Sequence, residues 1–304
     1  MQEHDNNPIG FDQAHALRRL MRGRQTDEPS PRRTHVIAVV SGKGGVGKTF
    51  LACNLAIALA GRGHRTVLFD MDMGLANADI VLGVEPAWTW VDMIRGRRVL
   101  EQVVVEGPGG IGFVAGGSGM AELAHLSEFE RHRLLEAMRR IESRYEVMVL
   151  DCGAGISPNV LGFASAADTV LVVATPEPTS ITDAYAMIKA FAGRRDLTGM
   201  LPVAQGAVGV IVNNAATRRE ARDTYERLAD VSGRFLHMLL TDFGYVLADE
   251  HVPVAVRCQQ PVLQSYPRSA ASCCLLAIAG RLSREIGGVE DRQGLLSRVM
   301  RLFL

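Results

Sequence analysis

Lysine is almost missing from this chain of 304 residues. Of its 33 basic residues only three are lysines, and the other 30 are arginines. Two of the three, Lys43 and Lys48, nevertheless lie within six residues of each other. A lysine ammonium is a compact point charge on a flexible stem, whereas a planar guanidinium requires fixed two-point geometry. Lysine kept at these two positions therefore indicates a site that handles a mobile phosphate group.

Other features that the sequence lacks exclude several classes of protein. It has no apolar run of about 18 residues or more, and its first residues lack the apolar stretch of a signal peptide. The formal net charge is zero, which argues against a polyanionic partner. The five cysteines include no C-x-x-C pair, which argues against a metal cluster and fits a reducing cytosol. The neighbours Cys273 and Cys274 lie in an apolar helical run and are expected to be small buried thiols.

The segment that contains the two lysines, Ser41–Thr49, matches the phosphate-loop pattern G-x-x-x-x-G-K-[ST]. A β-branched apolar run over Val36–Val40 precedes it, and a run of helix formers over Phe50–Ala60 follows, so the context is strand, loop, helix. The backbone N–H groups of such a loop surround the phosphates of a nucleotide. The residues predicted to bind the nucleotide are Gly42, Lys43, Gly44, Gly45, Val46, Gly47, Lys48 and Thr49.

The chain divides into three zones. Residues 1–34 are polar and are predicted to be a flexible extension with one short helical patch; residues 35–287 alternate apolar strands with amphipathic helices; residues 288–304 form a separate final segment. This alternation predicts an α/β fold, a doubly wound, mostly parallel sheet with helices on both faces. The strands expected after Val36–Val40 are Thr66–Asp70, Ile111–Ala115, Val147–Asp151, Thr169–Ala174, Val208–Val212 and Phe235–Leu240. The helices expected between them include Glu128–Ser143, Ile181–Ala192 and Arg218–Val231.

Carboxylates follow two of these strands, where parallel sheets bind their ligands. Asp151 ends one strand and is expected to hold Mg²⁺ through water, with Thr49 as the direct ligand. Asp72 follows the other and is placed to orient an attacking water molecule. The alternative for both is a solvated cap of the next helix. Asn213 and Asn214 also follow a strand, and an asparagine amide can pair with the edge of an adenine ring or form a turn.

Together these residues resemble the MinD/ParA class of P-loop ATPases, whose loop reads K-G-G-x-G-K-T. The resemblance implies that ATP is sandwiched between two subunits of a homodimer and hydrolysed with Mg²⁺ bound. Lys43 would be the signature lysine that reaches the partner's nucleotide, and Asp72 would be the switch I aspartate. With Lys48 these two would form the catalytic set. Asp151 would be the Walker B aspartate and Asn213 the base-contacting asparagine.

A narrower resemblance is to the flagellar number regulators of the FlhG/FleN type, and its motifs are Asp12–Arg18, Asp72–Asp79, Pro176–Tyr185 and Pro267–Ser272. In that type the Asp12–Arg18 element stimulates an FlhF-type GTPase, and flagellar basal-body proteins or transcriptional regulators are further expected partners. The resemblance also implies that Glu177 and Asp183 hold the signature lysine in the monomer.

The chain departs from that type beside the expected base pocket. Leu247 stands where relatives often have proline, and Pro253 and Val254 stand where they often have basic residues. Cys152-Gly153 is also an unusual pair after the Walker B aspartate.

The last segment, Gln293–Leu304, reads as a short basic amphipathic helix with Arg298 and Arg301 opposite a broad apolar face. This pattern suits an anionic membrane surface, and the alternative is a helix docked on its own domain. The resemblance favours the membrane, which implies a cytoplasmic protein that binds reversibly to the inner face of the cell membrane.

Three hypotheses follow for the function. The first is an ATP-dependent dimerisation switch that binds the membrane in its ATP form and controls flagellar number or placement. The second is a DNA-partitioning or cell-division-site ATPase; DNA binding would need basic residues such as Arg218, Arg219 and Arg222, and the zero net charge weighs against it. The third is a binding module with a vestigial site, which would bind nucleotide without hydrolysis.

Overall fold

The computed structural model describes residues 34–72, 76–117, 128–193 and 208–287, which belong to one compact unit. The element at Asp12–Arg18 and the final segment 288–304, with the amphipathic helix predicted at Gln293–Leu304, lie outside the described residues. Within them, none of the helices has the length and apolar character needed to cross a membrane.

The core of the fold is an eight-stranded sheet in the order β3-β4-β2-β5-β1-β6-β7-β8. Within the described residues every neighbouring pair is parallel except β3 and β4. Central strands are buried on both faces, which is why their sequences are continuously apolar. The strands are β1 His35–Ser41, β2 Thr66–Met71, β3 Val104–Glu106, β4 Gly112–Val114, β5 Val147–Ala154, β6 Thr169–Ala174, β7 Val208–Ala215 and β8 Thr241–Leu247.

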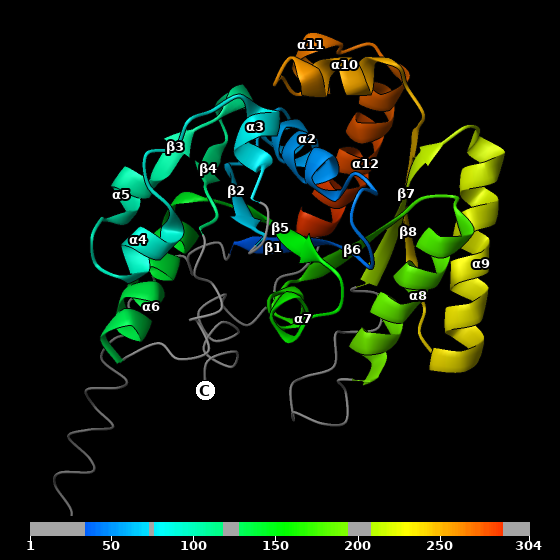
Figure 1. The fold of residues 1–304 in the computed structure, drawn as a ribbon, viewed down its shortest axis with the longest axis horizontal. Coiled ribbons are helices and arrows are strands. Elements are labelled where there is room, and N and C mark those ends of the chain that lie inside the picture. The colour runs from blue at the N-terminus through cyan, green and yellow to red at the C-terminus, as the bar shows by residue number, and fades with distance from the viewer. Residues whose placement is uncertain (1–33, 73–75, 118–127, 194–207, 288–304) are drawn as a thin grey trace, which may run out of the picture. The chain divides into compact units, whose positions relative to one another are not determined.

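Helices cover both faces of the sheet, as Figure 1 shows. One buried apolar cluster joins the sheet to α2 and α12, and a second joins the other face to α4, α6, α7, α8 and α9. The predicted doubly wound α/β fold is therefore confirmed. The helices are α2 Lys48–Ala60, α3 Ala78–Leu82, α4 Trp90–Ile94, α5 Leu100–Val103, the short 3₁₀ helix η1 Pro108–Gly110, α6 Glu128–Arg144, α7 Pro158–Ser165, α8 Pro178–Gly193, α9 Arg218–Leu236, α10 His251–Arg257, α11 Val262–Ser265 and α12 Ala270–Gly287.

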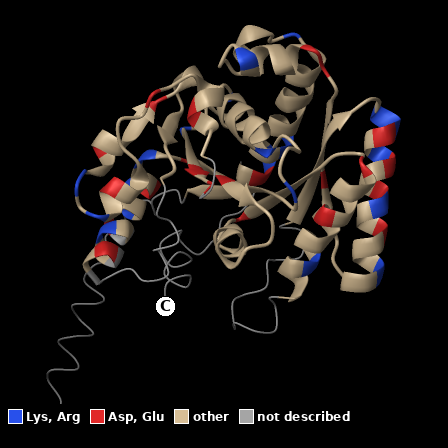
Figure 2. Cartoon of the chain, viewed as in Figure 1, with Lys and Arg blue, Asp and Glu red and all other residues tan. Residues whose placement is uncertain are grey.

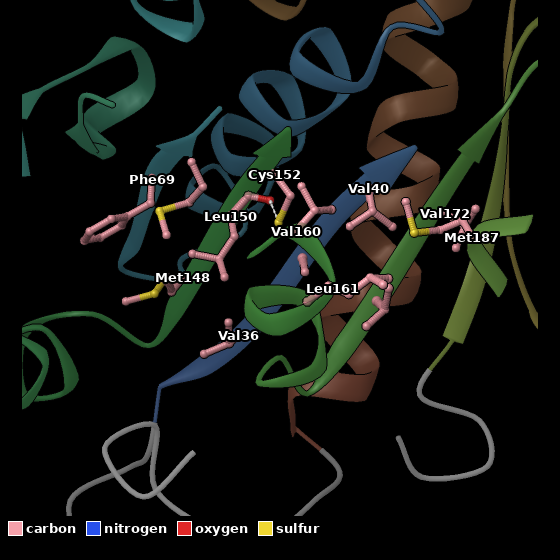
Figure 3. Close-up of a cluster of buried hydrophobic side chains, with 14 of the residues drawn as sticks. Val36, Val40, Phe69, Met148, Leu150, Cys152, Val160, Leu161, Val172 and Met187 are labelled. Carbon is pink, nitrogen blue, oxygen red and sulfur yellow. Dashed lines mark hydrogen bonds between the residues drawn. The ribbon is translucent and has the colours of Figure 1, made fainter. Parts of the chain in front are cut away.

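Alternating side chains of β1 enter the two clusters in turn. Val36, Ala38 and Val40 belong to one, and Ile37 and Val39 belong to the other. Figure 3 shows Val36 and Val40 with side chains of β5, β6, α7 and α8 on the same face. Burying each such aliphatic side chain contributes roughly 1.5–3 kcal/mol. This packing fixes the end of β1, from which the phosphate loop starts.

One predicted strand is wrong. Phe235–Leu240 is not a strand, because α9 continues to Leu236 and the chain then turns at His237 in a left-handed conformation, with φ 51°. Phe235 and Leu239 are 71% and 72% exposed, so this apolar run does not enter the sheet. The eighth strand is Thr241–Leu247, whose aspartate and glycine weaken the apolar pattern that marks the other strands.

Two further features differ from the expectations. The edge strand β3 runs antiparallel to β4, and its three residues are too few to give a periodic signal. The expectation that Cys273 and Cys274 are buried is also wrong, because Cys273 is exposed and Cys274 is partly exposed. Both lie near the start of α12, where Cys273 faces solvent and Cys274 still packs at the margin of the buried cluster under that helix.

Candidate nucleotide-binding site

The phosphate loop lies between the end of β1 at Ser41 and the start of α2 at Lys48. Gly45 and Gly47 have φ of 79° and 86°, a left-handed backbone that favours glycine. A Cβ on Gly47 would overlap the side-chain amide nitrogen of Asn213, and one on Gly42 would overlap the backbone of Asp183. The glycines of the motif are therefore required both by conformation and by close approach from β7 and α8.

The loop leads into a helix N-terminus that is suited to an anion. Among the described residues, no side chain caps α2 at Gly47, and the first turn contains no acid. The first N–H groups of a helix have no partner within the helix, and the helix dipole is positive there. The start of α2 can therefore bind phosphate, as the motif predicts.

Lys48 is turned into the protein. Its Nζ donates to Oδ1 of Asp151 at 2.6 Å and lies 3.5 Å from Oγ1 of Thr49. The two charged side chains are only 7% and 0% exposed. Burial raises the pKa of the Asp151 carboxyl, and the neighbouring Lys48 ammonium opposes that rise. The structure thus places the predicted Lys48, Thr49 and Asp151 together at the end of β1 and β5.

The donors here fit a magnesium ion bound with a nucleotide. Oδ2 of Asp151 is buried and has no hydrogen-bond partner among the described residues. The Thr49 hydroxyl lies beside the same carboxylate. Within the described residues no group of three or more His, Cys, Asp and Glu side chains could hold a metal ion. The described residues therefore offer Thr49 and Asp151, and the phosphates and water molecules would supply the other ligands.

Asp70 pairs in register with Asp151 but has a different task. Its carboxylate accepts hydrogen bonds from the backbone N–H groups of Asp72, Asn77 and Ala78, at 3.0–3.1 Å. Burial and the nearby Asp151 charge raise the pKa of Asp70 to about 6, although these hydrogen bonds act in the opposite direction. Asp70 therefore holds the chain that carries Asp72.

Asp72 comes directly after β2 and is half-buried. Its carboxylate points toward the end of β5, because a Cβ on Gly153 would lie 3.6 Å from its Oδ1. That distance is an ordinary van der Waals contact, so Asp72 lies directly beside β5. The structure thus brings Asp72 to the same edge of the sheet as Asp151.

Lys43 points away from the loop toward the start of α8. Its Nζ donates to Oε2 of Glu177 at 2.8 Å and to Oγ1 of Thr179 at 2.9 Å. Glu177 is one of the two acids that the resemblance assigned to this lysine; the other, Asp183, packs by its backbone against Gly42. The Lys43 and Glu177 side chains are 30% and 64% exposed, so the pair is accessible to solvent.

A cavity of about 490 Å³ opens beside the loop. Asn213 and Asn214 line it, but Asn213 already donates its side-chain N–H to the Val46 carbonyl at 2.8 Å. Asn213 therefore supports the loop as well as facing the cavity. The cavity is lined by Lys43 to Gly47, Phe50, Thr175, Glu177, Asn213, Asn214, Val246, Leu247, Asp249, Val252, Pro253 and Val256.

Sequence reasoning assigned no role to two polar residues of this region, Thr179 and Asp249. Thr179 contacts Lys43, and Asp249 lines the cavity with Asn214, which has φ 57°. Burial acts to raise the pKa of Asp249, but hydrogen bonds from backbone N–H groups of Ala271 and His251 hold it at about 2. Thr179 lies two residues after Glu177, so proximity in the sequence was the available signal for it.

Comparisons with known proteins agree with this geometry. Residues 37–254 match the model of the CobQ/CobB/MinD/ParA nucleotide binding domain family. The chain is 42% identical over 247 residues to the antiactivator FleN of Pseudomonas aeruginosa, covering 81% of this chain and 85% of that protein. It is 33% identical over 275 residues to the flagellum site-determining protein YlxH of Helicobacter pylori, covering 88% and 90%.

Solved structures share the fold. The septum site-determining protein MinD of Pyrococcus horikoshii, complexed with Mg-ADP, superposes with a TM-score of 0.64 at 22% identity, over 84% of this chain and 98% of that chain. MinD in the MinC:MinD complex of Aquifex aeolicus gives a TM-score of 0.64 at 24% identity, over 86% and 100%.

Proposed function

Because the chain belongs to the CobQ/CobB/MinD/ParA nucleotide-binding family, within its MinD/ParA ATPases, we propose that it is an ATP-dependent dimerisation switch. The observation that carries the proposal is Lys43, a second loop lysine that faces the nucleotide cavity and is held by an exposed partner. Because this pair is accessible to solvent, the Lys43 side chain can move away from Glu177 without unfolding the residues around it. In the proposed switch it leaves Glu177 and reaches ATP on a second copy of the chain.

ATP hydrolysis to ADP and phosphate is proposed for the assembled dimer. Lys48 exchanges Asp151 for the β- and γ-phosphates of ATP, and Lys43 from the partner copy approaches the γ-phosphate. These two ammonium groups stabilise the negative charge that develops on the transferred phosphoryl group. Asp72, beside the end of β5, orients the attacking water, and the N–H groups at the start of α2 hold the phosphates.

Thr49 and Asp151 would hold Mg²⁺. When bound, Mg²⁺ would supply charge neutralisation at the phosphates. If Lys48 leaves Asp151, that buried carboxylate would be free to help hold the ion. Asn213 and Asn214 face the base through the cavity lined by Leu247 and Pro253.

The biological role that we propose is control of flagellar number or placement, and the similarity to FleN and YlxH supports it. The switch would act on an FlhF-type GTPase through Asp12–Arg18, and on flagellar basal-body or transcriptional regulators. Its final segment, Gln293–Leu304, would bind an anionic membrane in the ATP form. Both segments lie outside the described residues, so the sequence pattern alone supports these two roles.

The arginines of α9 argue against the DNA-partitioning alternative. Arg222 pairs with Glu226 at 2.7 Å and Arg219 lies 3.9 Å from Asp223. Figure 2 shows acidic and basic residues interspersed along this helix. A helix face with mixed charge gives little attraction to a phosphate backbone.

The test is Lys43→Ala, with Lys189→Ala as the matched control because Lys189 is the third lysine and is exposed on α8. We expect Lys43→Ala to bind ATP yet form no stable dimer by light scattering, and to release phosphate about a hundredfold more slowly. Lys189→Ala should behave as the native chain does. An ATP-dependent dimer of Lys43→Ala would overturn the proposed switch, and nucleotide binding without hydrolysis in the native chain would favour the vestigial module.

A further inference from the structure

A second cavity, of about 430 Å³, lies at the edge of the sheet and shares no lining residue with the nucleotide cavity. We call it the β8–α12 pocket. It is lined by Arg218, Gly244, Tyr245, Cys273, Cys274, Ala277, Ile278 and Arg281. Strand β8 contributes to both cavities, since Gly244 and Tyr245 line this one and Val246 and Leu247 line the other.

The pocket spans the outer edge of β8. Within the described residues β8 is the last strand of the sheet, α12 covers one of its faces and α9 begins on the other (Figure 1). Arg218 comes from α9 and Arg281 from α12, yet both line the same cavity. The two guanidinium groups therefore approach one space from opposite faces of the sheet.

Local structure holds both arginines at this edge. Arg218 Nε donates to the Tyr245 hydroxyl at 2.7 Å. Arg281 lies over Gly244, where a Cβ would come within 2.8 Å of its Nη1, and Gly244 has φ 115°. Asp242 is the acid beside Arg281, but its Oδ1 is 4.0 Å away and accepts the Gly244 N–H at 2.8 Å. Two cations facing one partly engaged acid make the pocket attractive to carboxylates.

Two cysteine thiols also line the pocket, and both are at least partly exposed to solvent. Cys273 is exposed and Cys274 is partly exposed, and both line it together with apolar Ala277 and Ile278. Cys53 and Cys152 are buried, and burial raises the pKa of both thiols, that of Cys152 to about 12. Cys258 is exposed as well, but it does not line either cavity.

We propose that the β8–α12 pocket is a modification site at which Cys273 forms a mixed disulfide with a small thiol compound that carries carboxylates. The oxidant is the corresponding low-molecular-weight disulfide. The Cys273 thiolate attacks one sulfur, so that the bond between Cys273 and that sulfur forms as the original disulfide bond breaks. The other half leaves as a thiol that carries the proton lost by Cys273, and Cys273 is oxidised as the leaving half is reduced.

In this arrangement the arginines select the reagent and the cysteine reacts with it. Arg218 and Arg281 bind the carboxylates, while the apolar wall at Ile278 accepts the carbon chain. The site is independent of the proposed ATP switch, because its reaction needs neither nucleotide nor a second subunit.

The experiment treats the full-length protein with glutathione disulfide, which is anionic, or with cystamine, which is cationic, and maps the adducts by peptide mass spectrometry. At each cysteine we take the ratio of the rate with glutathione disulfide to the rate with cystamine. The intrinsic reactivity of the thiol cancels in this ratio. We expect this ratio to be roughly fivefold higher at Cys273 than at Cys258, the exposed thiol outside the pocket. Arg218→Gln and Arg281→Gln should each lower the ratio at Cys273 by about threefold.

Two controls make the outcome decisive. Arg257→Gln removes an exposed arginine beside Cys258 and should leave the ratio at Cys273 unchanged. Cys273→Ser should abolish the pocket adduct, while Cys258→Ser should not. If the arginine variants only disturbed the local structure, the rates of glutathione disulfide and cystamine at Cys273 would change by the same factor, and their ratio would stay the same. Equal ratios at Cys273 and Cys258, or ratios that ignore Arg218 and Arg281, would overturn the proposal.

Discussion

The contact between Lys43 and Glu177 sets how easily the proposed switch starts. At 2.8 Å the pair is well formed, but the Glu177 side chain is 64% exposed, and exposed ion pairs contribute about 0–1 kcal/mol. Glu177→Gln removes the charge and keeps a hydrogen-bond acceptor. We therefore expect the ATP concentration for half-maximal dimerisation, measured by light scattering, to fall by up to about fivefold.

Glu226→Gln is the matched control for Glu177→Gln. It removes an exposed acid from the Arg222 pair on α9, which is 2.7 Å long and lies away from the loop. Dimerisation of this variant should follow that of the native chain. If Glu177→Gln dimerises no more readily than Glu226→Gln, the pair does not hold Lys43 back.

Asp70 gives the fold a pH dependence opposite to that of a salt-bridged carboxylate. Its pKa rises from 3.8 to about 6 on folding, so between these values the native state binds more protons than the unfolded state. Asp70 therefore lowers the free energy of unfolding as the pH rises from about 4 to 6, by about 3 kcal/mol at most. In urea denaturation, the free energy of unfolding of the native chain minus that of Asp70→Asn should fall over that window and stay constant above about pH 7.

Asp70→Asn keeps one acceptor oxygen for the backbone N–H groups at residues 72–78 but loses the other, so a constant offset between the proteins is expected. Only the change with pH tests the assignment. A difference that grows between pH 4 and 6 would mean that the Asp70 carboxyl is stabilised in its charged form.

Side-chain roles could be predicted from the sequence where a motif fixes the backbone, and could not where the conformation of a loop sets the direction of the side chain. The positions of Lys48, Thr49 and Asp151 follow from a strand, a loop and a neighbouring strand end. Asp70 and Asp72 look alike in the sequence, and only the backbone N–H groups after β2 make one a structural acceptor. That Lys48 binds Asp151 before any nucleotide does was also invisible, because nothing in the pattern says where a flexible side chain rests.

At the scale of elements, the turn from β1 into α2 depends on two glycines with different surroundings. Gly45 and Gly47 both have positive φ, but a Cβ has open space at Gly45 and overlaps Asn213 at Gly47. Gly45→Ala should cost about 1 kcal/mol of unfolding free energy from backbone strain alone. Gly47→Ala should cost more and weaken nucleotide binding by isothermal titration calorimetry, because the loop must move away from β7.

The double variant Gly47→Ala/Asn213→Ala separates the two costs. Removing the Asn213 amide relieves the overlap but also removes the hydrogen bond to Val46. The loss of unfolding free energy in the double variant should therefore be smaller than the sum of the losses in the two single variants. Additive losses would show that Asn213 does not press on the loop.

Elements with a strong apolar period were predictable, and those that break the period were not. Strands β1, β2, β5, β6 and β7 read as continuous apolar runs because helices cover both of their faces. The apolar run at Phe235–Leu240 was mistaken for a strand because periodicity does not report which side chains are left in solvent. Strand β8 carries Asp242 and Gly244, which the outer edge of a sheet tolerates and a central strand would not.

At the scale of the whole molecule, the proposed switch and the DNA-partitioning alternative differ in what the ATP-bound dimer binds, a membrane in the first and DNA in the second. The switch gathers two copies of the final segment, Gln293–Leu304, on one dimer. One such segment would bind a membrane weakly, whereas two on one dimer would gain affinity through effective concentration, by about a hundredfold. A DNA-binding dimer would instead need a basic surface, and on α9 three of the arginines, Arg219, Arg222 and Arg234, lie 2.7–3.9 Å from acidic side chains.

Sedimentation with anionic liposomes distinguishes the two. The full-length chain should sediment with the liposomes in ATP and remain in the supernatant in ADP, and a chain ending at residue 290 should remain there in both. The Lys43→Ala variant keeps the final segment but is expected not to dimerise, so it should remain in the supernatant in ATP too, which ties membrane binding to the dimer. A gel shift with duplex DNA is run in parallel at the same salt concentration, because ionic strength governs binding to a phosphate backbone. Equal sedimentation in ATP and ADP, or sedimentation of the shortened chain, would contradict the membrane switch, and an ATP-dependent gel shift would favour DNA partitioning.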